Sequence, residues 1–200
     1  MSIPPFGAIA KFKGLLDWRK RGYSDNAPQF VKEAILQKYA IEDATWVETG
    51  TFMGATTRFL AELSPEVHTV EPAKKLFKRA TRKFSGTHVN VLNGTSEDIF
   101  PDLLPTLEGN ICFWLDGHYS AGQTFKGDTD CPVEDELNAI EASLGNFDNI
   151  SILIDDVRCF LSQSTDYSDY PSIDYLVDWA RSHDFDWRIE QDIFIIRNWV

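Results

Sequence analysis

The stretch Val47-Glu48-Thr49-Gly50-Thr51-Phe52-Met53-Gly54-Ala55-Thr56 decides the fold of this chain. It begins in a predicted strand, Thr45–Glu48, and two glycines then lead into a predicted helix. Glycine lets the backbone turn sharply and approach a ligand closely, and a helix that begins near Gly54 directs free amides towards an anionic group. The stretch therefore predicts the first strand–turn–helix unit of a ligand-binding α/β fold. A purely structural glycine turn is the alternative.

Beyond this stretch, short apolar segments alternate with helical ones. The alternation predicts βαβ units and a doubly wound, Rossmann-like three-layer αβα sandwich on a mostly parallel seven-stranded sheet. The last two strands are predicted to form a hairpin, so the final strand should run antiparallel. The predicted strands are Thr45–Glu48, Val67–Val70, Val89–Leu92, Ile111–Leu115, Ile150–Ile154, Trp187–Glu190 and Ile193–Arg197. The predicted helices between them are Thr56–Leu63, Ala73–Phe84, Ser96–Leu104, Pro132–Leu144 and Ile173–His183.

The first 40 residues follow a different pattern. Phe6–Arg21 and a second segment that ends near Tyr39 have the apolar spacing of helices. We expect residues 1–40 to form a helical cap in front of a single ligand-binding domain at 41–200. In one interpretation these helices only pack on the sheet, and in the other they cover a ligand.

The composition narrows the class of protein. The 200 residues carry 19 Lys and Arg against 31 Asp and Glu, a formal net charge of −12. This balance disfavours nucleic acid, because proteins bind its phosphates through Lys and Arg. With no long apolar run and no signal sequence, we expect a cytoplasmic protein without membrane contact. Three cysteines without a close pair indicate neither a zinc site nor a disulfide framework. A homodimer is left open.

Acidic residues follow the second and third predicted strands. An acidic side chain about 20 residues beyond such a glycine turn can accept hydrogen bonds from both hydroxyls of a ribose, and Glu71 has this position. A helix cap is the alternative for Glu71. In the segment Gly94-Thr95-Ser96-Glu97-Asp98, Thr95 or Ser96 can cap the next helix. In the functional interpretation, Ser96 and Glu97 lie beside an adenine ring.

Three aspartates follow the fourth and fifth predicted strands: Asp116, Asp155 and Asp156. These two strands should be neighbours in the sheet, so we expect the three carboxylates to meet at one edge of it. Like charges so close are unfavourable unless a cation joins them or a pKa rises. Oxygen ligands of this kind suit Mg²⁺, so the three aspartates are the expected metal ligands. Alternatively, one of the adjacent pair caps the next segment while Asp116 faces solvent.

His118 is the expected general base, because the unperturbed pKa of histidine lies near neutral pH. A structural histidine is the alternative, and the neighbouring Tyr119 could replace it as the base. The polar segment 120–130 that follows fits either a substrate-covering loop or an ordinary surface loop.

These segments, in this order, resemble the class I S-adenosylmethionine-dependent methyltransferases, and most of all the metal-dependent O-methyltransferases of the catechol and macrolide-sugar kinds. The resemblance covers about residues 45–160. It implies that Glu48 faces the amino group of the cofactor's methionine, that Thr56 faces its carboxylate and that Glu71 holds the ribose. The expected cofactor-binding residues are Glu48, Gly50, Thr51, Phe52, Gly54, Thr56, Glu71, Ser96, Glu97 and Asp116.

The resemblance also implies a mechanism, in which Mg²⁺ on Asp116, Asp155 and Asp156 positions an acceptor hydroxyl and lowers its pKa. Asp116 and His118 are then the expected catalytic residues, and the expected substrate is a small hydroxylated molecule such as a sugar. The chain departs from catechol enzymes at their base lysine, where Tyr119 is nearest. A non-catalytic module that binds S-adenosylmethionine or a nucleotide is one alternative. An NAD-type oxidoreductase is another, although the glycine spacing disfavours it.

Overall fold

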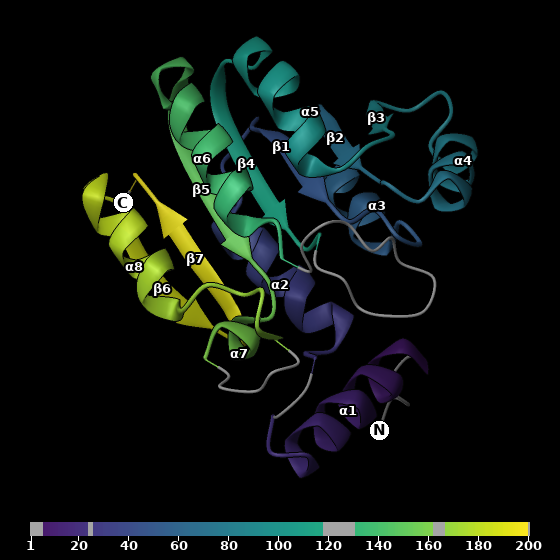
Figure 1. Ribbon diagram of the computed structural model, residues 1–200. Helices are drawn as coiled ribbons and strands as arrows, with labels where there is room; N and C mark the ends of the chain where they lie inside the picture. The colour runs from purple at the N-terminus through teal and green to yellow at the C-terminus, as the bar shows by residue number, and fades with distance from the viewer. Residues whose placement is uncertain (1–5, 24–25, 118–130, 162–166, 200) are drawn as a thin grey trace.

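A sheet of seven strands lies between two layers of helices (Figure 1). The structure is a computed structural model that describes residues 6–23, 26–117, 131–161 and 167–199. The strand order is β3-β2-β1-β4-β5-β7-β6. The strands are β1 (Thr45–Thr49), β2 (Val67–Val70), β3 (Val89–Leu92), β4 (Gly109–Leu115), β5 (Phe147–Ile154), β6 (Asp186–Glu190) and β7 (Ile193–Arg197).

Neighbouring strands from β3 to β5 pair in parallel, whereas β7 is antiparallel to both of its neighbours, β5 and β6. The doubly wound sheet and its antiparallel last strand are therefore confirmed. The sequence also predicts correctly that β4 and β5 are adjacent. Crossovers between parallel strands are right-handed, and the strand order reverses direction after β3. The helices before and after this reversal therefore cover opposite faces of the sheet.

Each face of the sheet is buried by its own group of helices. On one face pack α2 (Gln29–Tyr39), α3 (Ala55–Leu63) and α4 (Lys74–Lys83), with Trp46 and Trp114 at the centre of the apolar cluster. On the other face pack α5 (Ser96–Leu103), α6 (Val133–Ser143) and α8 (Ile173–Ser182). Short helices η1 (Leu104–Thr106), η2 (Leu144–Asn146) and α7 (Val157–Phe160) complete the connections.

The two-residue period of the strands decides which side chains meet at their ends. Trp46, Trp114 and Leu153 belong to the cluster beneath α2 and α3. Two residues further along each strand stand Glu48, Asp116 and Asp155. Because alternate residues of a strand point to the same face, β1, β4 and β5 each bring an acidic residue to this face at their carboxyl ends.

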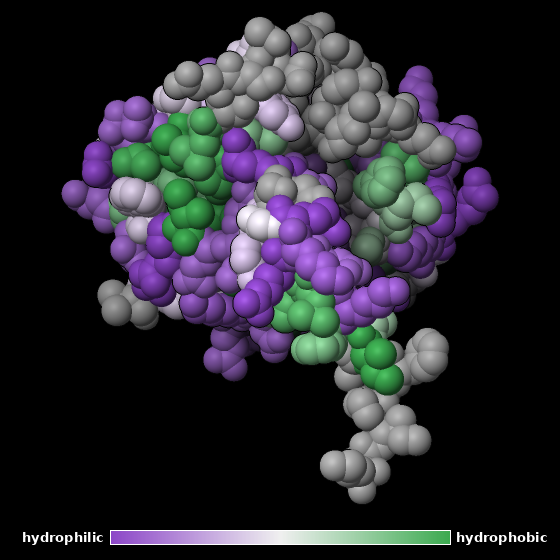
Figure 2. All heavy atoms as spheres, turned by 90° about the horizontal axis from the view of Figure 1, so that it is seen from below, coloured by the Kyte–Doolittle hydropathy of each residue, from purple (hydrophilic) through white to green (hydrophobic). Residues whose placement is uncertain are grey.

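The two N-terminal helices have different environments. Helix α2 packs on the sheet through its buried residues Ile35, Leu36 and Tyr39. Helix α1 (Phe6–Lys20) lies below the edge to which the parallel strands point, and Figure 2 shows scattered apolar patches among hydrophilic ones on that side. On α1 the exposed apolar side chains are Ile9, Phe12, Leu15 and Leu16. Within the described ranges, no helix has the length and apolarity needed to cross a membrane. The division at residue 40 stays a prediction.

The first glycine of the turn after β1 packs directly on the end of β4. Gly50 has φ +84°, and a Cβ atom there would lie 2.3 Å from the carbonyl oxygen of Asp116. Only glycine fits, because both the conformation and the space exclude a side chain. Gly86 has a similar φ of +76°, but a Cβ atom there would meet nothing within 4 Å. Comparison of Gly50 with Gly86 therefore separates the effect of backbone strain from that of steric overlap.

We expect Gly50→Ala to lower the free energy of unfolding by about 3 kcal/mol, as left-handed strain and overpacking add. Gly86→Ala should cost about 1–2 kcal/mol, because strain alone acts there. Urea denaturation of both variants measures the difference. Equal losses would show that Gly50 is not in close contact with the end of β4.

Candidate functional site

The turn between β1 and α3 is tied to the end of β2. The backbone amides of Gly50 and Thr51 donate to the carbonyl oxygen of Val70, at 3.1 and 3.2 Å. The amide of Gly54 closes the turn on the carbonyl oxygen of Thr51 at 2.7 Å. Gly54 itself is left-handed, with φ 66°, and is the N-cap residue of α3. The helix thus begins where the sequence predicted it, with its free amides at the carboxyl edge of the sheet.

Glu71 at the end of β2 faces this turn. One carboxylate oxygen accepts a hydrogen bond from the amide of Phe52 at 2.8 Å, and the other accepts from the amide of Ala73 at 2.9 Å. Burial raises the pKa of Glu71, and the two amides oppose that rise. Ala73 is the N-cap residue of α4, so Glu71 also supports a helix start, as the alternative proposed. Each carboxylate oxygen has two lone pairs, so both can accept a further hydrogen bond.

Glu48 has an internal position. Its side chain is 1% exposed, and one oxygen accepts hydrogen bonds from the hydroxyls of Thr57 at 2.5 Å and Thr69 at 2.6 Å. The other oxygen has no hydrogen-bond partner among the described residues. Burial raises the pKa of Glu48 to about 7. Glu48 therefore joins β1 to β2 and α3, and its contact with a methionine amino group stays a prediction.

Side chains from two helices hold the ends of the turn. The Thr56 hydroxyl accepts a hydrogen bond from the side-chain amide of Gln29 in α2, at 3.1 Å. The ammonium group of Lys83 in α4 donates to the carbonyl oxygens of Met53 and Gly54, at 2.9 and 2.5 Å. The sequence analysis missed Gln29 and Lys83, because neither adjoins the glycine motif in the chain. Both limit how far the turn can move.

The loop after β3 caps the helix that follows it, which is the structural one of its two predicted roles. Thr95 is the N-cap residue of α5, and its hydroxyl accepts a hydrogen bond from the amide of Asp98 at 3.3 Å. Ser96 is buried, and its hydroxyl donates to the Glu97 carboxylate at 3.1 Å. A contact of Ser96 or Glu97 with an adenine ring stays a prediction.

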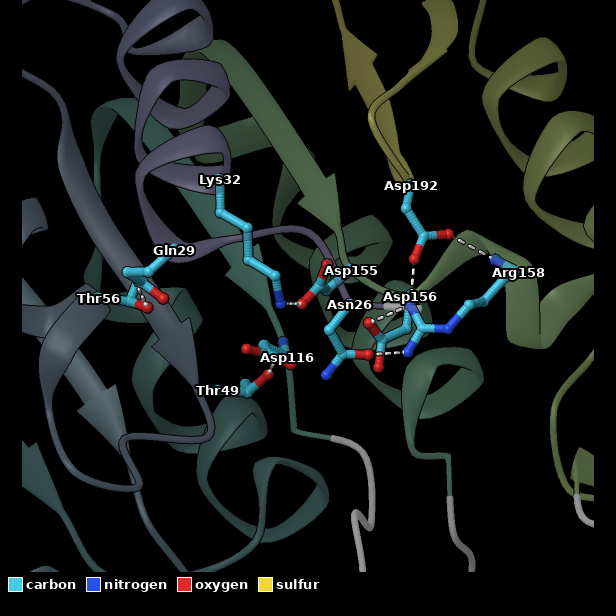
Figure 3. Close-up of polar contacts among 10 residues, drawn as sticks. All are labelled: Asn26, Gln29, Lys32, Thr49, Thr56, Asp116, Asp155, Asp156, Arg158 and Asp192. Carbon is cyan, nitrogen blue, oxygen red and sulfur yellow. Dashed lines mark hydrogen bonds and ion pairs between the residues drawn. The ribbon is translucent and has the colours of Figure 1, made fainter. Parts of the chain in front are cut away.

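The aspartates at the ends of β4 and β5 do come together (Figure 3). The amide of Asp116 is held by the carbonyl and hydroxyl oxygens of Thr49, at 3.3 and 3.2 Å. Asp155 is 1% exposed, and its carboxylate forms an ion pair with the ammonium group of Lys32 in α2. Burial acts to lower the pKa of Lys32, but the nearby aspartates outweigh it and raise that pKa. A side chain of the N-terminal segment thus enters the cluster.

A second cation balances Asp156. The guanidinium group of Arg158 bonds the Asp156 carboxylate at 2.8 Å, and it also pairs with Asp192 and with the side-chain oxygen of Asn26 (Figure 3). Asp156 has φ 60° and is the N-cap residue of α7. The side chains of Asp156 and Arg158 lie against each other at the start of this helix (Figure 3).

The expected Mg²⁺ site does not match this arrangement. Within the described ranges, no three His, Cys, Asp or Glu residues are grouped so that they could hold a metal ion. Lys32 and Arg158 pair with two of the three expected ligands, Asp155 and Asp156. Burial and the neighbouring Asp155 raise the pKa of Asp116 well above its usual range, and burial raises that of Asp155 to about 6. The repulsion among the carboxylates is therefore relieved by protein cations and by raised pKa values.

Two charged residues that the sequence analysis missed lie on the apolar stripes of helices. In α2, Lys32 shares the buried face with Ile35, Leu36 and Tyr39. In α6, on the opposite face of the sheet, Glu136 shares the buried face with Val133, Leu137, Ile140 and Ser143. A charge at the i, i+3, i+4 and i+7 positions of an apolar stripe is the signal that could have identified both.

Glu136 is 1% exposed, and neither carboxylate oxygen has a hydrogen-bond partner among the described residues. Burial raises its pKa to about 7, against the opposing effect of the Ser96 and Thr49 hydroxyls. Its carboxylate also lies close to Gly117, where a Cβ atom would be 3.5 Å from one oxygen. Glu136 is thus a buried acid under the ends of β1 and β4, with no ion-pair partner among the described residues.

The expected general base, His118, lies outside the described residues, as do Tyr119 and the rest of 118–130. The identity of the base therefore stays a prediction.

Comparison with known proteins finds no matching family model and no matching curated protein. The structure is similar to ErmE, a 23S rRNA methyltransferase, with 16% identity and a TM-score of 0.53 over 85% of this chain and 67% of that chain. It is also similar to the N-methyltransferase NodS from Bradyrhizobium japonicum WM9 in complex with S-adenosylhomocysteine, with 12% identity and a TM-score of 0.54 over 87% and 89%. At these identities the likeness shows the fold, which this chain shares with class I methyltransferases.

The raised pKa of Glu136 predicts a pH dependence of stability. The native state holds the proton to about pH 7, whereas the unfolded state releases it near 4.5, so stability falls as the pH rises between these values. We expect Glu136→Gln to remove this fall. Between pH 4.5 and 8, the free energy of unfolding of the variant should rise by about 3 kcal/mol relative to that of the wild type.

Urea denaturation across that pH range measures the gain. Glu134→Gln, at an exposed position of the same helix, is the matched control and should show little change. A constant difference between wild type and Glu136→Gln would mean that Glu136 is not a buried, destabilising charge.

Proposed function

We propose that this chain is an S-adenosylmethionine-dependent methyltransferase that acts on a hydroxyl group of a small molecule. The observation that carries the proposal is the contact between Glu71 and the amide of Phe52, which places a buried acid directly on the glycine turn. An acid and a glycine turn at the ends of adjacent parallel strands form the usual nucleoside site of such sheets. The fold shared with class I methyltransferases supports the choice of cofactor.

The charges of the site suit this cofactor. S-adenosylmethionine carries a positive sulfonium group, and Glu48, Asp116 and Asp155 bring three acidic side chains to the same face of the sheet end, where a nearby positive charge favours their ionised forms. Each carboxylate oxygen of Glu71 accepts one hydrogen bond from the described residues, and its second lone pair suits a ribose hydroxyl. The Thr56 hydroxyl and the free amides at the start of α3 are suited to the methionine carboxylate.

The acceptor is proposed from the chemistry at the ends of β4 and β5. Asp116 is partly exposed beside the cofactor turn, where its carboxylate can accept a hydrogen bond from a substrate hydroxyl. The acceptor oxygen would form a bond to the methyl carbon as the carbon–sulfur bond breaks, with the electron pair passing to sulfur and the proton to His118. The net charge of −12 favours a small hydroxylated substrate, such as a sugar, over nucleic acid.

We expect Glu71→Gln to weaken the binding of S-adenosylhomocysteine about 10- to 100-fold, because a neutral amide replaces a charged acceptor for the ribose hydroxyls. Titration calorimetry measures the affinity, and Glu62→Gln, at an exposed position of α3, is the control. The proposal fails if the wild type binds NAD but not S-adenosylhomocysteine. Unchanged affinity of Glu71→Gln would remove Glu71 from the nucleoside site.

A methyl-transfer screen over sugars, catechols and nucleotide sugars tests the acceptor. We expect Asp116→Asn to reduce the turnover of any accepted substrate about 100-fold, because a neutral amide oxygen accepts the hydrogen bond of the hydroxyl more weakly than a carboxylate and is not basic. The exposed Asp148→Asn is the control and should retain full activity. Tight cofactor binding without transfer to any hydroxyl compound would favour a non-catalytic binding module.

A further inference from the structure

We propose that the ammonium group of Lys32 is the resident cation of the aspartate cluster, in the position where the sequence predicts Mg²⁺, and that this site binds no divalent metal ion. The role of Lys32 towards the acceptor depends on the proposed function, but the cation preference of the cluster does not. The proposal concerns a residue that lies outside every motif of the sequence.

The first support is the geometry of Lys32. Its side chain is 11% exposed, and that of its partner Asp155 is 1% exposed. The stem of Lys32 comes from the buried face of α2, and its ammonium group lies 5.8 Å from the centre of the Trp114 ring. Trp114 is fully buried at the centre of the apolar cluster. The ammonium group is therefore enclosed by the protein and is not a mobile surface charge.

The second support is the distribution of charge. Arg158 pairs with Asp156 and Asp192, which leaves Asp116 and Asp155 to be balanced by another cation. Both of these aspartates act on the charge of Lys32, as does Asp156. A divalent ion between Asp116 and Asp155 would be placed beside an enclosed ammonium group, and repulsion between such like charges is strong where water is excluded. Metal binding and the Lys32 ion pair therefore exclude each other.

The third support is the chemistry that the ammonium group offers. It has three N–H donors, and Asp155 accepts one of them. Among the described residues the other two have no hydrogen-bond acceptor, so they can donate to an acceptor oxygen beside Asp116. Lys32 is thus a positioning residue: it keeps Asp155 in place, and its fixed charge favours negative charge on a nearby oxygen. A metal ion would supply the same two effects.

The experiment measures Mn²⁺ binding by electron paramagnetic resonance, without any substrate or activity. The proteins are the wild type, Lys32→Met and Lys32→Arg, with Lys38→Met as the matched control. Lys38 lies in the same helix, where it forms a partly exposed ion pair with Glu190. Circular dichroism establishes that each variant is folded.

We expect no Mn²⁺ binding by the wild type, Lys32→Arg or Lys38→Met at millimolar metal. Lys32→Met should bind Mn²⁺ at least about tenfold more tightly, because it exposes two carboxylates without their cation, and adding Asp155→Asn should abolish the gain. Mn²⁺ binding by the wild type that Asp116→Asn removes would overturn the proposal, and it can be measured even if Lys32→Met does not fold. A folded Lys32→Met that gains no affinity would overturn it as well.

Failure of the inference about Lys32 is distinguishable from failure of the proposed function. S-adenosylhomocysteine binding by calorimetry, in the presence of a chelator, reports on the nucleoside site alone. Cofactor binding together with Mn²⁺ binding by the wild type would overturn only the inference about Lys32. A wild type that binds neither S-adenosylhomocysteine nor Mn²⁺ would overturn only the proposed function.

Discussion

Carboxylates that are buried or half-buried at the ends of parallel strands require compensation of their charge, and this requirement organises the carboxyl edge of the sheet. The sheet aligns β1, β4 and β5 in parallel, so their last residues meet at one edge. Glu48, Asp116 and Asp155 then share one face. Charge buried in a medium of low polarity is unfavourable unless a partner balances it or a proton neutralises it. The chain uses both solutions, at different positions along the same edge.

The charge of the carboxylates is compensated differently on the two faces of the sheet. Beneath α2, Lys32 provides a positive charge for Asp155, and hydroxyl groups of Thr57 and Thr69 bond to Glu48. Beneath α6, Glu136 has no cation beside it among the described residues, and its carboxyl group is neutralised through a raised pKa. The result is an edge that combines fixed ion pairs with groups that titrate near neutral pH. Such groups are common at functional sites, because the same burial that perturbs them also excludes water from substrates.

The fold alone does not select the substrate. ErmE is a 23S rRNA methyltransferase and NodS is an N-methyltransferase, and both share the architecture of this chain at low identity. Function in such sheets depends on the side chains that the loops and adjoining helices bring to the edge. In this chain those side chains are mainly acidic, and the cation that pairs with Asp155 comes from a helix that precedes the first strand.

The sequence by itself determined the elements and their order. The two-residue repeat of strands and the 3.6-residue repeat of helices are local patterns, so the strands, the longer helices, the C-terminal hairpin and the glycine turn were predictable to within a few residues. The short helix α7 was not predicted. The adjacency of β4 and β5 followed from the rules of parallel connections, and it brought Asp116 near Asp155. The position of Glu71 opposite the turn was predictable for the same reason.

Only the tertiary structure decided which charges meet. Lys32 and Asp155 are 123 residues apart in the chain, and no local pattern connects them. The sequence shows three aspartates whose charges need balancing, but it does not show that Lys32, which precedes β1 in the chain, supplies a cation. Lys32 reaches Asp155 only because the apolar stripe of α2 packs on the sheet. Charge balance is decided in the folded protein, because the interaction between two charges depends on their distance in space and not on their separation along the chain.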